Sequence, residues 1–182
     1  KDEKIKLKRI HTFCVVDAAE YICRHERLSQ EDTQLALLIA LLHDIGKIGI
    51  PEDLLNKKGK LTDDEYRLIQ THVENSISII RHLPSLDYVI PAVLGHHERW
   101  DGKGYPRGLR GDENPIAARC ICVADTFDAM TTKRSYRDPL PLSTAIDEIK
   151  KGANTQFDPK LANLFVQLIE EGKIQVLQEY DE

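Results

Sequence analysis

The sequence feature that most constrains the fold is an uncharged apolar run that ends in a histidine and an aspartate. Residues 35–42 are all Leu, Ala or Ile, and His43 and Asp44 follow directly. The run predicts a helix without a polar face, which belongs inside a core. A buried imidazole and a buried carboxylate are costly unless they are paired or bind a metal ion. A lone His-Asp pair is more often a hydrogen-bonded helix end, so the rest of the chain must decide between the two interpretations.

The other apolar positions recur at helical spacing, and no stretch alternates with the period of a β-strand. Thr62 with Glu65 is a capping box, and Ser29 and Asp158 are N-cap candidates. These signals place a short helix after Pro51 and longer ones at residues 5–27, 29–44, 62–80, 86–97, 115–130, 143–152 and 158–172. The sequence therefore predicts an all-α fold with one domain over residues 1–182 and about seven helices.

Composition excludes several classes of protein. The net charge of −5 argues against binding a nucleic acid polymer through bulk charge. No apolar run reaches the ~20 residues of a membrane span, and no signal-peptide pattern opens the chain. Four cysteines on apolar stretches without metal-site spacing predict reduced core residues of an intracellular, cytoplasmic protein. The chain begins at Lys1 without Met, and we expect a fragment or output domain of a longer protein.

A glycine-rich loop at residues 99–111 interrupts the helical pattern after His96, His97 and Glu98. It holds four of the chain's ten glycines and its only tryptophan, Trp100. Glycine permits turns and close approach of the backbone to other groups. Because long loops in compact domains are usually functional or disordered, this loop is a candidate for function.

Imidazoles and carboxylates accumulate at the buried helical stretches. The set is too large for one tetrahedral zinc site and suits two clustered ions that share a carboxylate. Two such ions serve phosphate chemistry, because they generate hydroxide at neutral pH and stabilise the attacking and leaving oxygens. Basic side chains could hold phosphate oxygens. The candidate ligands are His11, His43, Asp44, His72, His96, His97 and Asp125, and the candidate phosphate contacts are Lys47, Arg134 and Arg137.

These residues, in this order, resemble the ligand pattern of the HD superfamily of metal-dependent phosphohydrolases. Residues 43–47 (His-Asp-Ile-Gly-Lys), 96–102 (His-His-Glu-Arg-Trp-Asp-Gly) and 104–106 (Gly-Tyr-Pro) are similar to the HD-GYP subfamily. The resemblance covers roughly His11 to Phe165. It implies an all-α enzyme that hydrolyses the bacterial second messenger cyclic di-GMP, mainly to linear pGpG, with two divalent ions, iron or manganese.

The resemblance also implies roles by position. The seven candidate ligands would bind the two ions, with Asp44 as the bridge. Lys47 would be catalytic and steady a phosphate or the hydroxide, and Arg134 and Arg137 would hold the phosphates, although Arg137 equally suits a solvated charge. Tyr105 would lie near the substrate or a protein partner. Trp100 and Tyr105 are candidates for stacking on guanine, and Trp100 equally suits packing under the loop.

Two positions depart from the pattern of the subfamily. Members with a third metal carry Glu four residues before the first ligand histidine, where this chain has Leu7. Residues four apart lie on one face of a helix, and Leu7 has no ligand atom, so the sequence predicts two ions. Relatives often carry Gly at the position of Ser76, and the serine would tighten or reshape the pocket.

Other functions stay open at the level of sequence. An HD enzyme could act on another cyclic dinucleotide or on a nucleoside phosphate. A module of another class could bind a cyclic dinucleotide or a cyclase partner through the loop without turnover, although a pure binder has no need of seven ligands. A homodimer and a protein partner at the loop are compatible with the pattern as well.

Overall fold

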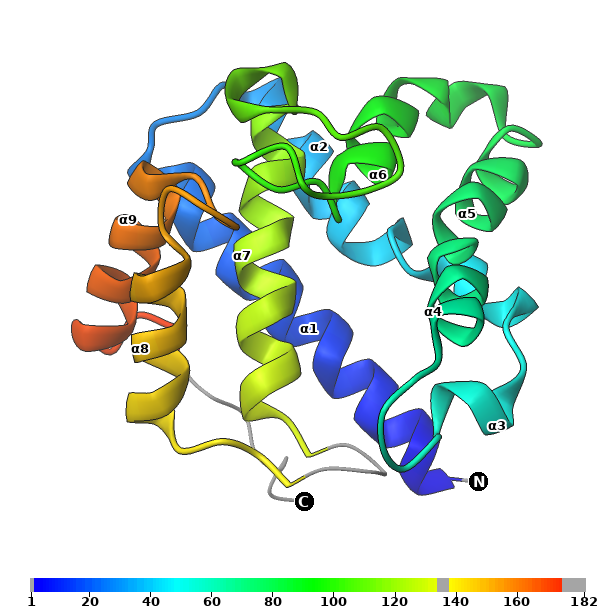
Figure 1. The fold of residues 1–182 in the computed structure, drawn as a ribbon. Helices are drawn as coiled ribbons and strands as arrows, with labels where there is room; N and C mark the ends of the chain where they lie inside the picture. The colour runs from blue at the N-terminus through cyan, green and yellow to red at the C-terminus, as the bar shows by residue number, and fades with distance from the viewer. Residues whose placement is uncertain (1, 134–137, 175–182) are drawn as a thin grey trace.

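The computed structural model of the protein describes residues 2–133 and 138–174, with side chains from His11 onward. Arg134 and Arg137 therefore lie outside the described residues. The described residues contain no β-strand, which confirms the all-α prediction (Figure 1). The α-helices are α1 Asp2–His25, α2 Gln30–Leu42, α3 Glu52–Leu55, α4 Asp63–Gln70, α5 His72–Ile80, α6 Ile90–Gly95, α7 Ile116–Thr131, α8 Leu142–Gly152 and α9 Pro159–Glu170; the 3-10 helices are η1 Ile45–Gly49, η2 Pro84–Val89 and η3 Gly111–Glu113.

Helix α7 forms the centre of the hydrophobic core. It packs against α1, α2, α6, α8 and α9, and Figure 1 shows it upright near the middle of the molecule, with α1 crossing diagonally behind it and the α8–α9 pair to its left. Ile121, Val123 and Phe127 of α7 are buried, and the ring of Phe127 meets that of Phe165 on α9 edge to face at 5.1 Å. The Asp125 side chain on this largely buried helix is only 19% exposed, which raises the cost of leaving this carboxylate unpaired.

The capping predictions are confirmed. The hydroxyl of Thr62 accepts from the Glu65 N–H at 3.3 Å, and the Glu65 carboxylate accepts from the Thr62 N–H at 2.8 Å. Ser29 and Asp158 cap α2 and α9 through their side-chain oxygens. The helix expected over 62–80 is divided into α4 and α5 at Thr71, whose hydroxyl donates to the carbonyl oxygen of Leu68 at 2.7 Å.

Burial of the apolar run on α2 is less complete than the sequence predicts. Ala36, Ile39 and Ala40 are buried, whereas 56% of Leu41 is exposed. The expectation of a helix enclosed on all sides is wrong, because α2 packs against α1 and α7 while its last turn reaches the surface before η1. His43, the C-cap of α2, is nevertheless 2% exposed.

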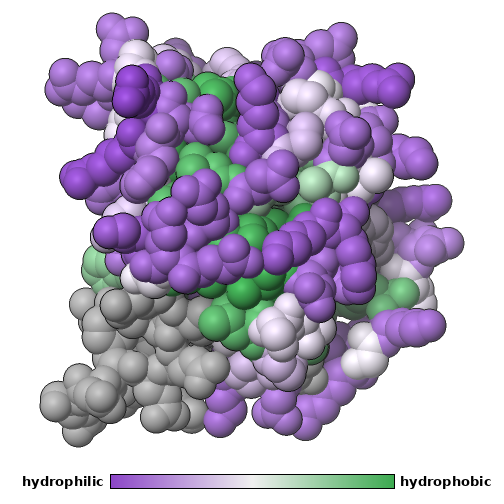
Figure 2. All heavy atoms as spheres, turned by 90° about the vertical axis from the view of Figure 1, so that its left-hand side faces the viewer, coloured by the Kyte–Doolittle hydropathy of each residue, from purple (hydrophilic) through white to green (hydrophobic). Residues whose placement is uncertain are grey.

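Helices α8 and α9 cover one side of α7 and turn polar residues outward. Figure 2 shows this side largely covered by hydrophilic side chains, with hydrophobic ones in a band between them. Lys150 on α8 pairs with Glu170 on α9 at 3.0 Å. None of the described helices combines the length and the hydropathy needed to cross a membrane. The four cysteines are free thiols, and Cys23, Cys120 and Cys122 are buried as predicted.

Candidate metal centre

The structure brings all seven candidate ligands together from five parts of the chain. Their imidazole nitrogens and carboxylate oxygens form two groups, and within each group the ligand atoms lie within 4.8 Å of one another. The first group takes its residues from the turn after α2, from α5 and from the end of α6. The second takes them from α1, the end of α2 and α7. The groups are Asp44, His72, His96 and His97, and His11, His43 and Asp125.

Asp44 lies between the two groups. Its Oδ1 is 3.5 Å from Nε2 of His72, in the first group. Its Oδ2 is 3.6 Å from Nε2 of His43 and 3.9 Å from Nε2 of His11, both in the second group. Each oxygen of one carboxylate thus faces a different set of nitrogens, which is the geometry that a bridge between two ions requires.

Four of the five histidines are oriented by a contact at Nδ1. The Nδ1 atoms of His43, His72 and His96 donate to backbone carbonyls one turn earlier, of Ile39 and Ala40, Ile69 and Val93 respectively, and Nδ1 of His11 contacts Asp128. A proton on Nδ1 leaves the lone pair on Nε2, and this second contact is usual for metal-binding histidines. The set is therefore arranged to present Nε2 atoms to an ion.

Two buried atoms of the cluster support this interpretation. Nε2 of His43 and Oδ1 of Asp44 have no hydrogen-bond partner among the described residues. A buried polar atom without a partner costs about 1–3 kcal/mol. Ions bound at the two groups would satisfy both atoms, so the donor set fits two divalent metal ions. Imidazole and carboxylate ligands suit several such ions, iron and manganese included.

Burial keeps the histidines of the first group neutral. Desolvation lowers the pKa of His97 to about 4 and lowers the pKa values of His72 and His96 as well. For His96 the neighbouring His97 and His43 add to the effect of burial. Because neutral imidazole is the form that binds a metal, these side chains are ready as ligands at pH 7.

Positive neighbours keep the two carboxylates ionised. Burial alone would raise the pKa of Asp44, but the neighbouring Lys47 ammonium holds that pKa well below its usual range. The Lys47 ammonium donates directly to Oδ2 of Asp44. Burial is likewise outweighed at Asp125, whose pKa is lowered by His11 and His43. Lys47 therefore lies beside the cluster, as its predicted role requires.

Ser76 fixes the turn that carries Asp44. Its hydroxyl donates to the carbonyl oxygen of His43 at 2.9 Å and accepts from the Gly46 N–H at 2.8 Å. A Cβ at Gly46 would lie 2.0 Å from the carbonyl oxygen of His72, so this position excludes a side chain. Gly46 and Ser76 thus allow η1 and α5 to contact each other closely, and whether the serine tightens the pocket stays a prediction.

Asp128 is a site residue to which the sequence analysis gave no role. It lies one turn after Asp125 on α7 and is 3% exposed. Oδ2 of Asp128 is 2.5 Å from Nδ1 of His11, and Oδ1 accepts from the hydroxyl of Thr132 at 2.7 Å. The sequence did contain a signal for this role, because Asp125 and Asp128 are three residues apart on an apolar helix and therefore lie on the same face.

Glu98 is a second residue without a predicted role. Its side chain is 1% exposed, and its carboxylate accepts the backbone N–H groups of Arg107, Gly108 and Leu109 at 2.6 to 3.1 Å. The loop also approaches the end of α6 so closely that a Cβ at Gly104 would lie 2.5 Å from the carbonyl oxygen of His97. A buried carboxylate thus holds the glycine-rich loop against the candidate ligand histidines at the end of α6.

The two aromatic residues of the loop have different surroundings. The Tyr105 ring stacks on the His97 ring, with centroids 4.8 Å apart and an interplanar angle of 27°. Trp100 instead lies against the Arg119 guanidinium, 5.6 Å from the ring centroid, and Arg119 binds Asp158 at 2.5 Å. The structure therefore gives Trp100 the packing role and places Tyr105 at the cluster.

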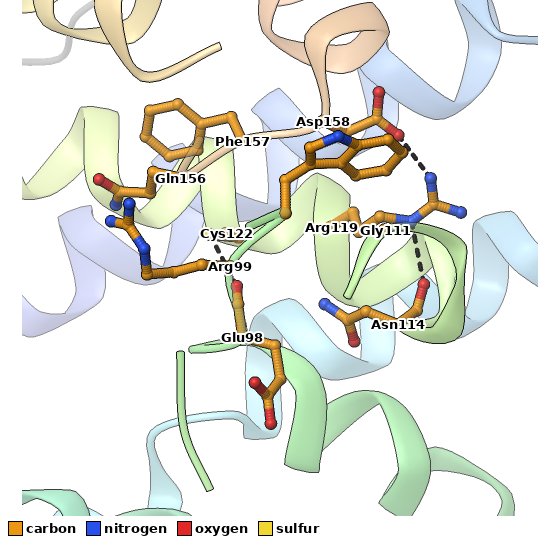
Figure 3. Close-up of a pocket in the computed structure, with 10 residues that line it drawn as sticks. Glu98, Arg99, Gly111, Asn114, Arg119, Cys122, Gln156, Phe157 and Asp158 are labelled. Atoms are coloured by element: carbon orange, nitrogen blue, oxygen red, sulfur yellow. Dashed lines mark hydrogen bonds and ion pairs between the residues drawn. The ribbon is translucent and has the colours of Figure 1, made fainter. Parts of the chain in front are cut away.

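The space beneath the loop is small. Figure 3 shows Arg119 and Asp158 on one side of it, with the Glu98 carboxylate pointing away from them. The cavity measures about 10 Å³, room for one water molecule at most. A nucleotide does not fit there, so the candidate substrate site is the ligand cluster itself.

This chain is similar to known proteins over most of its length. A family model described as HD domain matches residues 3–161, most of the chain. A cyclic di-GMP phosphodiesterase of Thermotoga maritima is 42% identical over 134 residues, which cover 72% of this chain and 36% of that protein. A 3'3'-cGAMP-specific phosphodiesterase of Vibrio cholerae is 35% identical over 165 residues, which cover 88% of this chain and 30% of that protein. The chain thus spans about a third of the length of these relatives.

Solved structures show the same fold. A cyclic GMP-AMP specific phosphodiesterase of Vibrio cholerae superposes with a TM-score of 0.69 at 22% identity, over 90% of this chain and 44% of that chain. An HDG"Y"P protein of Bdellovibrio bacteriovorus superposes with a TM-score of 0.72 at 20% identity, over 88% of this chain and 51% of that chain. These structures share the fold of this chain, and the matched family model shows that the chain belongs to the HD domain family.

Proposed function

We propose that this chain is the catalytic domain of a cyclic dinucleotide phosphodiesterase, with cyclic di-GMP as its substrate. The observation that carries the proposal is Asp44, whose two oxygens face two separate groups of ligand atoms. Relatives that are 35–42% identical to this chain over aligned segments of 134 and 165 residues are named for cyclic di-GMP or 3'3'-cGAMP. Two bound ions would supply a hydroxide at neutral pH and offset charge on the phosphoryl oxygens.

The chain's own residues would do the remaining work. Lys47, which contacts Oδ2 of Asp44, would hold a proton or a phosphate oxygen beside the cluster. Tyr105, whose pKa burial raises further above its ordinary value, would pack against the imidazole of His97 and exclude water from that side. Arg134 and Arg137 follow α7 in the sequence, and we retain them as candidate contacts to the phosphates on the sequence pattern alone.

We further propose that the site is dinuclear and that its main product is linear pGpG. The seven ligands divide into two groups, and residue 7, one turn before His11 on α1, is a leucine without a ligand atom. Elemental analysis of protein loaded with excess manganese should give two ions per chain. Three ions held by protein side chains, or rapid conversion of cyclic di-GMP to GMP, would contradict this part of the proposal.

The central experiment is turnover of cyclic di-GMP by manganese- or iron-loaded protein, followed by chromatography of the products. Asp44→Asn should abolish turnover and reduce the metal content, because one change weakens the contacts to both ions. Asp147→Asn, on the exposed side of α8, is the matched control and should change neither. Full activity of Asp44→Asn with an unchanged metal content would show that Asp44 only ends the helix and does not bind the ions.

A second candidate substrate is 3'3'-cGAMP, because several relatives are named for it. The same assay with both cyclic dinucleotides decides between them through the ratio of kcat/KM. Binding of either compound without turnover would favour the interaction module instead. A cytoplasmic location, a homodimer and a protein partner at the glycine-rich loop stay predictions, and size-exclusion chromatography with light scattering tests the homodimer.

A further inference from the structure

Four rings form a row from the ligand cluster to the surface. The centroids of His96 and His97 are 4.0 Å apart, those of His97 and Tyr105 are 4.8 Å apart, and those of Tyr105 and Tyr66 are 6.3 Å apart. We call these four residues the aromatic row. Its inner end, His96, is 1% exposed, whereas Tyr66 on α4 is 48% exposed. The row therefore connects the candidate metal site with solvent through a tyrosine.

The outer ring of the row is the one available to a ligand. Tyr105 is engaged on His97 and meets Tyr66 edge to face, with an interplanar angle of 80°. Trp100, the other aromatic candidate for stacking, packs against Arg119. Tyr66 has ring contact with Tyr105 and keeps about half of its surface exposed. Isolated exposed tyrosines are ordinary, and it is the position of Tyr66 in the row that distinguishes it.

We propose that Tyr66 stacks on a purine base of the cyclic dinucleotide while the scissile phosphate lies at the Asp44 cluster. The inference rests on the proposed function, because it needs a nucleotide at the ligand cluster. In a nucleotide the base and the phosphate are separated by one sugar. In the protein, Tyr66 and His97 are separated by one ring, that of Tyr105, so a nucleotide whose phosphate lies at the cluster could place its base near Tyr66. Stacking on an aromatic ring tolerates any base. Tyr66 would therefore add affinity for purines and would not discriminate guanine from adenine.

The experiment compares two ligands that differ only by a base. Dissociation constants of GMP and ribose 5-phosphate for manganese-loaded protein are measured by calorimetry. Base stacking contributes about 1–3 kcal/mol, so Tyr66→Leu should weaken GMP binding roughly 5- to 150-fold and leave ribose 5-phosphate binding unchanged. Tyr66→Phe, which keeps the ring, should bind GMP as the wild type does. Tyr88→Leu, at a tyrosine of η2 that is 55% exposed, is the matched control.

Each alternative outcome has one meaning. An equal loss of affinity for both ligands would show that Tyr66 acts on the phosphate site through Tyr105, which overturns base stacking. Unchanged GMP binding by Tyr66→Leu, or a loss with Tyr66→Phe as large as with Tyr66→Leu, would overturn it too. Failure of the wild type to hydrolyse cyclic dinucleotides would instead count against the proposed function. The binding experiment does not depend on turnover, so the two failures remain distinguishable.

Discussion

Nδ1 of His11 on α1 lies 2.5 Å from Oδ2 of Asp128 on α7, so a buried carboxylate orients the histidine that faces Asp44 and Asp125. Burial would lower the pKa of His11, but the hydrogen bond that its Nδ1 donates to Asp128 and the charges of Asp125, Asp128 and Asp44 raise it. Partners of this kind fix the ring and increase the basicity of the ligating nitrogen. Asp128 is therefore a positioning residue of the candidate metal centre.

Asp128→Asn should weaken metal binding while the fold persists. Loss of a carboxylate behind a ligating histidine typically costs roughly 10–100-fold in metal affinity. Competition with a chelator of known affinity measures the effect, and circular dichroism checks the fold. Asp147→Asn serves again as the exposed control. Unchanged affinity would mean that Asp128 serves packing alone.

Ser76→Ala should lower the free energy of unfolding by about 1–3 kcal/mol. The substitution leaves the buried Gly46 N–H without its acceptor and the carbonyl oxygen of His43 without its donor. The turn that carries Asp44 should loosen with it. Denaturant unfolding gives the free energy of unfolding, and metal titration gives the affinity. Ser78→Ala on the exposed side of the same helix should change neither quantity. Equal stability of the two variants would contradict the role assigned to Ser76.

Local signals in the sequence predicted most of the helices, and the structure brings the seven candidate ligands together in two groups. Ser29, Thr62 and Asp158 start helices through contacts within four residues, which a sequence pattern can represent. The contacts of Asp128 with His11 and of Ser76 with His43 join residues 117 and 33 positions apart. The 3.6-residue periodicity of a helix carries no information about contacts between residues so far apart in the sequence. The predicted 62–80 helix is divided at Thr71, and its second half, α5, packs against η1, a contact that the local sequence does not reveal.

Glu98 shows a different limit of sequence analysis. A glutamate between two histidines and a glycine-rich loop looks like a solvated charge, yet it is buried because three successive N–H groups of the loop surround its carboxylate. Tyr66 shows the converse. It lies on the short polar helix α4, where an exposed tyrosine is not unusual. Only the structure shows that its ring contacts Tyr105.

Glu98→Gln should free the glycine-rich loop. An amide has one acceptor oxygen where the carboxylate has two, so at least one of the N–H groups of Arg107, Gly108 and Leu109 would face an NH₂ group. Amide hydrogen exchange at these three residues should accelerate, and activity should fall as Tyr105 leaves His97. Glu74→Gln, exposed on α5, is the control. Unchanged exchange rates would show that another contact holds the loop.

The last prediction concerns pH and the metal-free protein. The folded-state pKa of His97 is about 4 and those of His72 and His96 are also lowered, so below pH 6.5 the unfolded chain binds more protons than the folded one. Stability should therefore fall as the pH drops from about 6.5 to about 4, by ~2–4 °C in Tm for each kcal/mol lost. His11, whose pKa is raised, acts in the opposite direction, but it is one group against three. Thermal unfolding in EDTA across this range measures the slope, which His97→Gln should reduce and His82→Gln, at an exposed histidine, should leave unchanged. A slope for His97→Gln equal to that of the wild type would show that His97 is not held neutral by burial.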